Sequence, residues 1–151
     1  MKKALILTIF IICGVLTFHA DAAAQRNVTP AVDPILEADA KHNLDVARQA
    51  FTLKKAYKGV LLRFEETYAA YPDFSNIEEF LYLAGMSSYY LSQNKGRQKV
   101  NPKSDREKDK YAPEKLKSDA VAYLGTIVEK YPQSSYREEA EKTLKTLQAA
   151  Q

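Results

Sequence analysis

Two Tyr-Pro corners, sixty positions apart, constrain the fold of this chain more than any other feature. Tyr71-Pro72 and Tyr131-Pro132 each follow a run of apolar residues at helical spacing. After each corner come a serine and, three positions later, a glutamate: Ser75 with Glu78, and Ser135 with Glu138. A residue before proline is pushed away from helical geometry, and S-x-x-E is the capping box that starts a helix. This recurrence in register predicts helical hairpins related by an internal repeat.

Apolar residues at spacings of three and four mark a helix on each side of these corners. Around the first corner they are Tyr57, Val60, Leu61, Phe64 and Tyr68, then Ile77, Phe80, Leu81 and Ala84. The expected helices run from Asp33 to about Leu53, from Ala56 to Tyr71, from Ser75 to about Leu91, from Ala112 to Tyr131 and from Ser135 to about Leu147. No segment alternates as a strand does. The sequence therefore predicts an all-α domain over residues 33–149, with about five helices in antiparallel hairpins stacked as a short α-solenoid.

Residues 1–24 have the pattern of a secretory signal peptide. Two lysines precede an apolar run from Ala4 to Phe18, and small residues suited to cleavage follow. Cys13 lies inside that run and follows the bulky Ile12, so we expect no lipidation there. Residues 25–32 have no periodicity, and we expect a disordered tether. The mature protein is thus expected in the periplasm, either free or associated with the outer membrane, with neither cysteine nor a retained transmembrane helix.

A basic insertion at residues 93–111 separates the two helices of the second hairpin. Between positions 95 and 110 it has seven basic and three acidic residues. The basic side chains considered for binding are Lys95, Arg97, Lys99, Lys103 and Arg106. We expect a long loop, which is either a solvated insertion or a docking loop for an acidic partner or an anionic lipid. The formal net charge of +3, from 22 basic and 19 acidic residues, does not indicate a nucleic-acid partner.

These hairpins resemble the tetratricopeptide repeat, a unit of about 34 residues with two antiparallel helices. When Pro72 is aligned with the last proline of the repeat, Leu44, Phe51 and Phe64 fall on its apolar positions. Within that family, residues 63–92 and 120–147 most resemble the BamD family of periplasmic outer-membrane assembly factors. The shared run is an aromatic residue, acidic residues, Tyr-Pro, a serine, Glu-Glu and Leu-Tyr-Leu. The resemblance implies a stacked helical scaffold that binds protein segments.

We find no catalytic constellation in the expected mature chain. His42 is its only histidine, and the glycine-rich phosphate loop and the H-E-x-x-H spacing are both missing. We therefore expect no enzyme activity, no cofactor and no metal site. The resemblance instead implies a partner-binding groove on the first helix of each repeat, formed by His42, Asp45, Gln49, Tyr82, Met86 and Tyr89. For Tyr82 and Tyr89, packing against a neighbouring helix is the alternative.

The function that follows is a periplasmic tetratricopeptide-like adaptor that binds a protein segment, as in outer-membrane protein assembly. Two alternatives come from other classes of protein. One is a cell-envelope structural protein that associates with itself through its tyrosine face. The other is an accessory domain that contacts peptidoglycan or anionic lipid through its basic loop.

Overall fold

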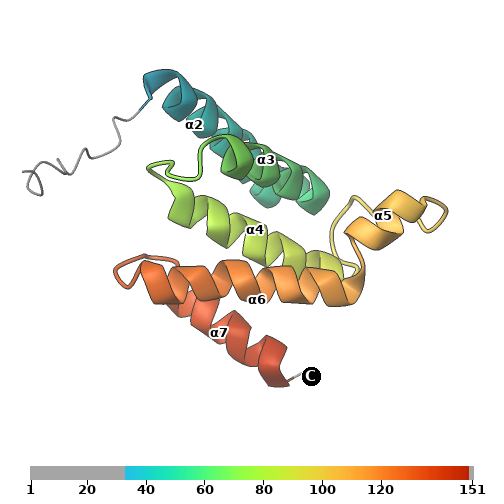
Figure 1. The fold of residues 1–151 in the computed structure, drawn as a ribbon. Helices are drawn as coiled ribbons and strands as arrows, with labels where there is room; N and C mark the ends of the chain where they lie inside the picture. Colours follow the sequence, from blue (N-terminus) through green and yellow to red (C-terminus); the bar gives the residue numbers. More distant parts are fainter. Residues whose placement is uncertain (1–32, 150–151) are drawn as a thin grey trace, which may run out of the picture. The chain divides into compact units, whose positions relative to one another are not determined.

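The computed structural model describes residues 33–149, so the expected signal peptide and tether lie outside the described residues. The elements are α2 (Pro34–Gln49), a π-helical turn η1 (Ala50–Lys54), α3 (Tyr57–Ala70), α4 (Ile77–Ser92), α5 (Asp105–Lys110), α6 (Pro113–Lys130) and α7 (Arg137–Ala149). No strand occurs among residues 33–149, and the predicted all-α class is confirmed. Figure 1 shows α2 beside α3, then α4 beside α6, with α7 following on the far side of that second pair.

The first helix begins where the sequence predicted. The Oδ1 atom of Asp33 accepts hydrogen bonds from the backbone N–H groups of Ile35 and Leu36, at 2.9 and 3.3 Å. Pro34 occupies the first turn, where its missing N–H costs nothing. The helix widens into the π-helical turn η1 and stops at Lys55, whose φ of 48° is left-handed. This residue turns the chain into α3 without a glycine.

Both Tyr-Pro corners end their helices and have the same backbone structure. Helix α3 stops at Ala70 and α6 at Lys130, one residue before each tyrosine. In the first corner, the N–H of Phe74 donates to Tyr71 O and the N–H of Ile77 donates to Phe74 O. The second corner repeats this ladder sixty residues later, through Tyr131, Ser134 and Arg137. The expected internal repeat is therefore present in the described chain.

The two predicted capping boxes are wrong. Helix α4 begins at Ile77 after Asn76, which makes no capping bond with its side chain. Ser75 instead turns toward α2, where its hydroxyl and its N–H both donate to the carboxylate of Glu37. At the second corner Ser134 Oγ accepts from Tyr136 N at 3.3 Å, and α7 starts only at Arg137. Each helix therefore starts two residues after the serine of its predicted capping box.

Helix α4 forms the centre of the described fold. Ten of its 16 residues are buried, because α3, α6 and α7 all pack against it. Gly85 sets the closest approach to α6: a Cβ atom there would lie 2.7 Å from both Cγ and Cδ2 of Leu124. Ser87 and Ser88 are also fully buried. Small side chains along α4 thus allow α6 to pack closely on it.

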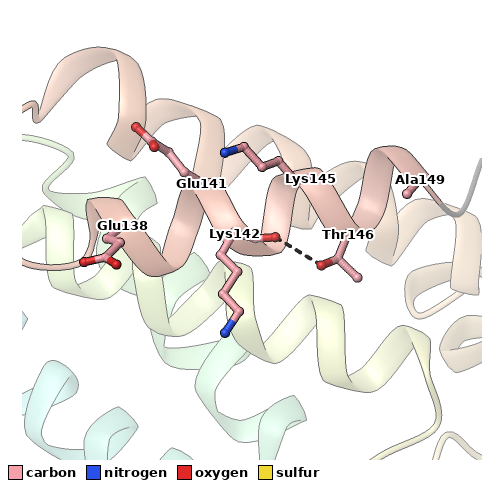
Figure 2. Close-up of a pocket in the computed structure, with 6 residues that line it drawn as sticks. All are labelled: Glu138, Glu141, Lys142, Lys145, Thr146 and Ala149. Carbon is pink, nitrogen blue, oxygen red and sulfur yellow. Dashed lines mark hydrogen bonds between the residues drawn. The ribbon is translucent and has the colours of Figure 1, made fainter.

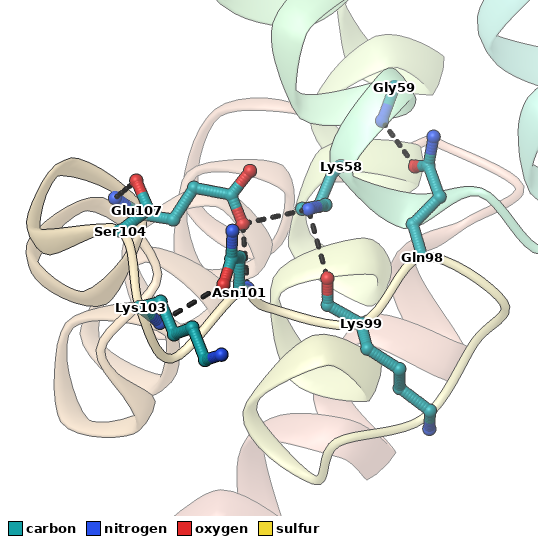
Figure 3. A network of polar contacts seen from close by, with 8 residues as sticks. All are labelled: Lys58, Gly59, Gln98, Lys99, Asn101, Lys103, Ser104 and Glu107. Atoms are coloured by element: carbon teal, nitrogen blue, oxygen red, sulfur yellow. Dashed lines mark hydrogen bonds and ion pairs between the residues drawn. The ribbon is translucent and has the colours of Figure 1, made fainter.

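The insertion at residues 93–111 is not the irregular loop that we expected, because it contains α5 and is attached to α3. Ser104 caps α5 by accepting from the N–H of Glu107. The carboxylate of Glu107 accepts from Lys58 Nζ at 2.9 Å and from the N–H of Asn101 at 2.8 Å (Figure 3). These donors, the Asn101 N–H foremost, lower the pKa of Glu107. Gln98 Oε1 accepts a further hydrogen bond from the N–H of Gly59, at 3.1 Å.

Candidate functional site

Helices α2, α4 and α7, the first helices of successive hairpins, carry the face on which the sequence predicted partner binding; we name it the A-helix face. An ion pair joins the first two. Arg48 on α2 donates from Nε and Nη2 to the two carboxylate oxygens of Glu79 on α4, each at 2.5 Å. Its Nη1 donates to Asp45 at 2.6 Å. The bond to Glu79 is the main cause of the raised pKa of Arg48, so the guanidinium stays charged.

An aromatic pair joins α4 to α7 on the same face. The ring of Tyr82 stacks on that of Tyr136, with centroids 4.6 Å apart. The Tyr82 hydroxyl donates to Glu139 at 2.7 Å. Burial, followed by this bond to a carboxylate, raises the pKa of Tyr82, so the phenol keeps its proton and remains a donor at neutral pH. Contacts between side chains therefore cross the A-helix face from α2 through α4 to α7.

The structure does not place all six predicted binding residues in one open groove. Met86 is only 3% exposed, and its sulfur accepts from the hydroxyl of Thr143 on α7 at 3.6 Å. Its predicted role in lining a groove is therefore wrong, because α7 covers it. Tyr82 packs against α7, and Tyr89 is half-buried with its ring 5.6 Å from that of Tyr90.

The three predicted binding residues on α2 remain on the surface. His42, Asp45 and Gln49 are all exposed, at successive turns of the helix. Asp45 is held by Arg48, whereas His42 and Gln49 flank that pair. The part of the A-helix face that a partner can reach is thus its α2 side.

A second feature, which the sequence analysis missed, lies where the insertion meets η1. A hollow of about 670 Å³ opens between η1, the start of α3, the end of α4 and residues 94–99. We name it the lysine hollow. Its lining includes Phe51, Tyr57 and Tyr90 together with Lys55, Lys95 and Lys99. Two of these lysines belong to the predicted basic loop and Tyr90 lies shortly before it, whereas Phe51, Lys55 and Tyr57 come from a distant segment of the sequence.

The remaining basic residues of the insertion do not share this hollow. Arg97 is exposed, and its N–H holds the turn by donating to Lys55 O at 3.0 Å. Lys103 and Arg106 are exposed farther along the chain, toward and within α5. The five predicted basic residues thus divide into two that line a hollow and three that do not.

A second hollow, of about 660 Å³, lies along the outer side of α7 (Figure 2). Its lining consists of Glu138, Glu141, Lys142, Lys145, Thr146 and Ala149. The two carboxylates lie toward the start of the helix and the two ammonium groups follow them, so the charges balance and the hollow favours neither an anion nor a cation. This side of α7 fits the solvated outer face that a terminal helix of a repeat array needs.

Other kinds of site find no support in the part of the chain that the structure describes. No three histidine, cysteine or acidic side chains gather there as metal ligands would. None of the helices in that part combines the length and apolar character needed to cross a membrane.

The repeated corners and side-by-side hairpins define a helical-repeat protein of the tetratricopeptide-like class. Residues 20–150 match the family YfiO, described as outer membrane lipoprotein, and the chain belongs to this family. The resemblance to the BamD family is thereby confirmed. No curated protein and no solved structure matches the chain.

Proposed function

We propose that this chain is a periplasmic adaptor that holds a segment of another protein during the assembly of the outer membrane. Its membership of a family of outer membrane lipoproteins supports a place in the cell envelope. The observation that carries the proposal is the cross-connected A-helix face, where Arg48–Glu79 and Tyr82–Glu139 fix three helices relative to one another. A face that is held rigid before binding loses little conformational entropy when a partner docks.

The α2 side of this face is the proposed contact surface. His42 and Gln49 are exposed there on either side of the ion pair between Arg48 and Glu79. Peptide segments that bind such a surface use side-chain pockets and hydrogen bonds and require no reactive group. The tyrosine face that self-association would use is occupied by α7 through Tyr82 and Tyr136, so we do not advance that alternative.

Site-specific photocrosslinking in intact cells tests the proposal. A photoreactive amino acid is placed at His42 or Gln49 on α2, and at Glu129, an exposed position on α6, as the control. We expect one shared adduct from the two α2 positions and none from position 129. Adducts of equal yield at all three positions would contradict a specific contact surface. An adduct with twice the mass of the chain would instead support self-association.

The ion pair provides a second variant. Arg48→Ala removes the connection between α2 and α4 but leaves the photoreactive position unchanged. If the rigid face carries the function, the yield of the adduct from position 49 falls in this variant. Lys41→Ala, an exposed cation elsewhere on α2, is the matched control and should leave the yield unchanged.

A further inference from the structure

The lysine hollow has walls that are fixed by the backbone. Lys55 and Asn94 both take left-handed conformations, with φ of 48° and 55°, and the N–H of Arg97 ties the two segments together by donating to Lys55 O. Gly96 has a φ of +96°, and a Cβ atom there would lie 2.6 Å from the Tyr57 ring. Only glycine fits this turn, so the insertion sits on the ring with no space for a side chain.

Three aromatic rings form the floor. The ring centroids of Phe51 and Tyr57 are 5.6 Å apart, those of Tyr57 and Tyr90 are 5.2 Å apart, and those of Phe51 and Tyr90 are 6.1 Å apart. These separations are typical of aromatic clusters, which offer ring faces and edges to a further apolar group. Phe51 and Tyr90 are only partly buried, so part of this cluster remains accessible from the hollow.

The rim of the lysine hollow is basic, and the segments that form most of it contain no acidic residue. Residues 50–59 and 93–104, which form most of the hollow, contain seven lysines and arginines and no aspartate or glutamate. Within residues 33–149, no carboxylate oxygen lies within 4.0 Å of the ammonium groups of Lys55, Lys95 or Lys99. Lys95 instead lies over the Tyr90 ring at 5.7 Å, and Lys99 donates to Asn94 O at 2.6 Å.

Within the described chain, the lysines of the hollow lie close together without a carboxylate partner. Elsewhere in residues 33–149 some cations do pair with carboxylates, as Lys110 does with Glu65 and Lys115 with Asp119. Lys58 on α3 likewise pairs with Glu107 of the insertion and does not line the hollow. At the hollow three lysines surround an accessible apolar surface, and the two features together point to one kind of ligand.

We propose that the lysine hollow binds an acidic protein segment, with an apolar or aromatic side chain against the three rings and flanking carboxylates on the lysines. This inference rests on the proposed adaptor function and adds a second contact point, outside the A-helix face. An anionic polymer without apolar groups would make no apolar contact with the three aromatic rings. A flat lipid surface would meet the lysines but could not fill a hollow of about 670 Å³.

The probe is a fluorescein-labelled octapeptide of aspartate and glutamate with one central phenylalanine, titrated with the full chain and followed by fluorescence anisotropy at low salt. Two control peptides separate the contributions: one has alanine for phenylalanine, and the other has asparagine and glutamine for the acids. We expect both control peptides to bind at least about fivefold more weakly, because one loses the contact with the aromatic rings and the other loses the ion pairs with the lysines. Affinity should also fall as salt is added.

Variants localise the binding. Lys95→Gln/Lys99→Gln removes two rim charges and should weaken the acidic peptide roughly tenfold. Lys142→Gln/Lys145→Gln, an equal loss of charge on the outer side of α7, should change the affinity less than about twofold. Tyr90→Leu keeps an apolar side chain but alters the floor. It should weaken the phenylalanine peptide while leaving the weaker alanine peptide unchanged. Circular dichroism melts confirm that each variant is folded.

Several outcomes would overturn the inference. They are equal effects of the two double variants, equal binding of the neutral peptide, and failure of the acidic peptide to bind at all. Binding of phosphatidylglycerol vesicles that depends on Lys95 and Lys99, without peptide binding, would assign the hollow to lipid instead. The adaptor function is tested separately by the adducts from positions 42 and 49. If those adducts persist in the Lys95→Gln/Lys99→Gln chain while the peptide fails to bind, only the hollow is refuted.

Discussion

Replacing Gly85 with alanine tests how closely α4 and α6 pack. The new Cβ atom would lie 2.7 Å from two carbons of Leu124, whereas ordinary contacts begin at 3.4 Å. Leu124 is fully buried, so its side chain has no open space to enter. Overpacking of this kind costs about 1–3 kcal/mol. The gain in helix propensity from glycine to alanine offsets about 1 kcal/mol of that cost. We therefore expect a net destabilisation of about 1 kcal/mol.

Gly125 provides a matched control on α6. A Cβ atom at Gly125 would meet nothing within 4 Å, so Gly125→Ala should gain helix propensity without overpacking. The expected change is a stabilisation of about 0.5–1 kcal/mol. Urea denaturation followed by circular dichroism at the helical band measures both variants. In thermal melts we expect the midpoint to fall by about 3–5 °C for Gly85→Ala and to rise by a similar or smaller amount for Gly125→Ala.

A double-mutant cycle identifies the cause. Leu124→Ala removes the atoms that the new Cβ would meet, so Gly85→Ala in that background should become neutral or stabilising. The reasoning is refuted if Gly85→Ala stabilises the wild-type chain as much as Gly125→Ala does. It also fails if the cost of Gly85→Ala is unchanged in the Leu124→Ala background.

Two further predictions concern the ion pairs between elements. Arg48→Lys keeps the charge but loses the bidentate contact with Glu79. Because Arg48 is 41% exposed, we expect urea denaturation to show that the free energy of unfolding falls by only about 0.5–1 kcal/mol. An unchanged midpoint would contradict this. In the insertion, the pKa of Glu107 in the folded protein lies below its ordinary value of 4.5. The ionised Glu107 therefore holds α5 to α3 fully above pH 4.5, and this stabilisation is lost as the pH falls through the lowered pKa. Limited proteolysis by pepsin should therefore cut residues 93–111 faster as the pH falls through that range, and Glu107→Gln should remove the dependence.

Local signals in the sequence were sufficient for five of the helices, for the start of α2 and for the helix ends at the two Tyr-Pro corners. Pro72 and Pro132 terminate helices by their own covalent geometry, and Asp33 caps α2 by bonds to its neighbours, so none of these depends on the tertiary fold. The capping boxes failed for the opposite reason. The Ser75 hydroxyl bonds the carboxylate of Glu37, which is 38 residues away in the sequence, and no local sequence pattern predicts that contact.

The candidate sites were harder to predict because they depend on which helices meet. Met86 has a suitable character for a binding groove, but α7 covers it. The lysine hollow combines rings from η1, α3 and α4 with lysines from the insertion, and these segments come together only once the corner at Lys55 is formed. The alternating charges of residues 105–110 concealed α5, since a helix of six residues leaves no periodic signal.

The position of α4 has a consequence for how the domain unfolds. In a linear repeat array each unit touches only its neighbours, so the ends can melt while the middle persists. Here α4 contacts α2, α3, α6 and α7, and opening any hairpin exposes part of the same buried helix. Denaturation should accordingly be a single cooperative event, with tyrosine fluorescence and helical circular dichroism changing together.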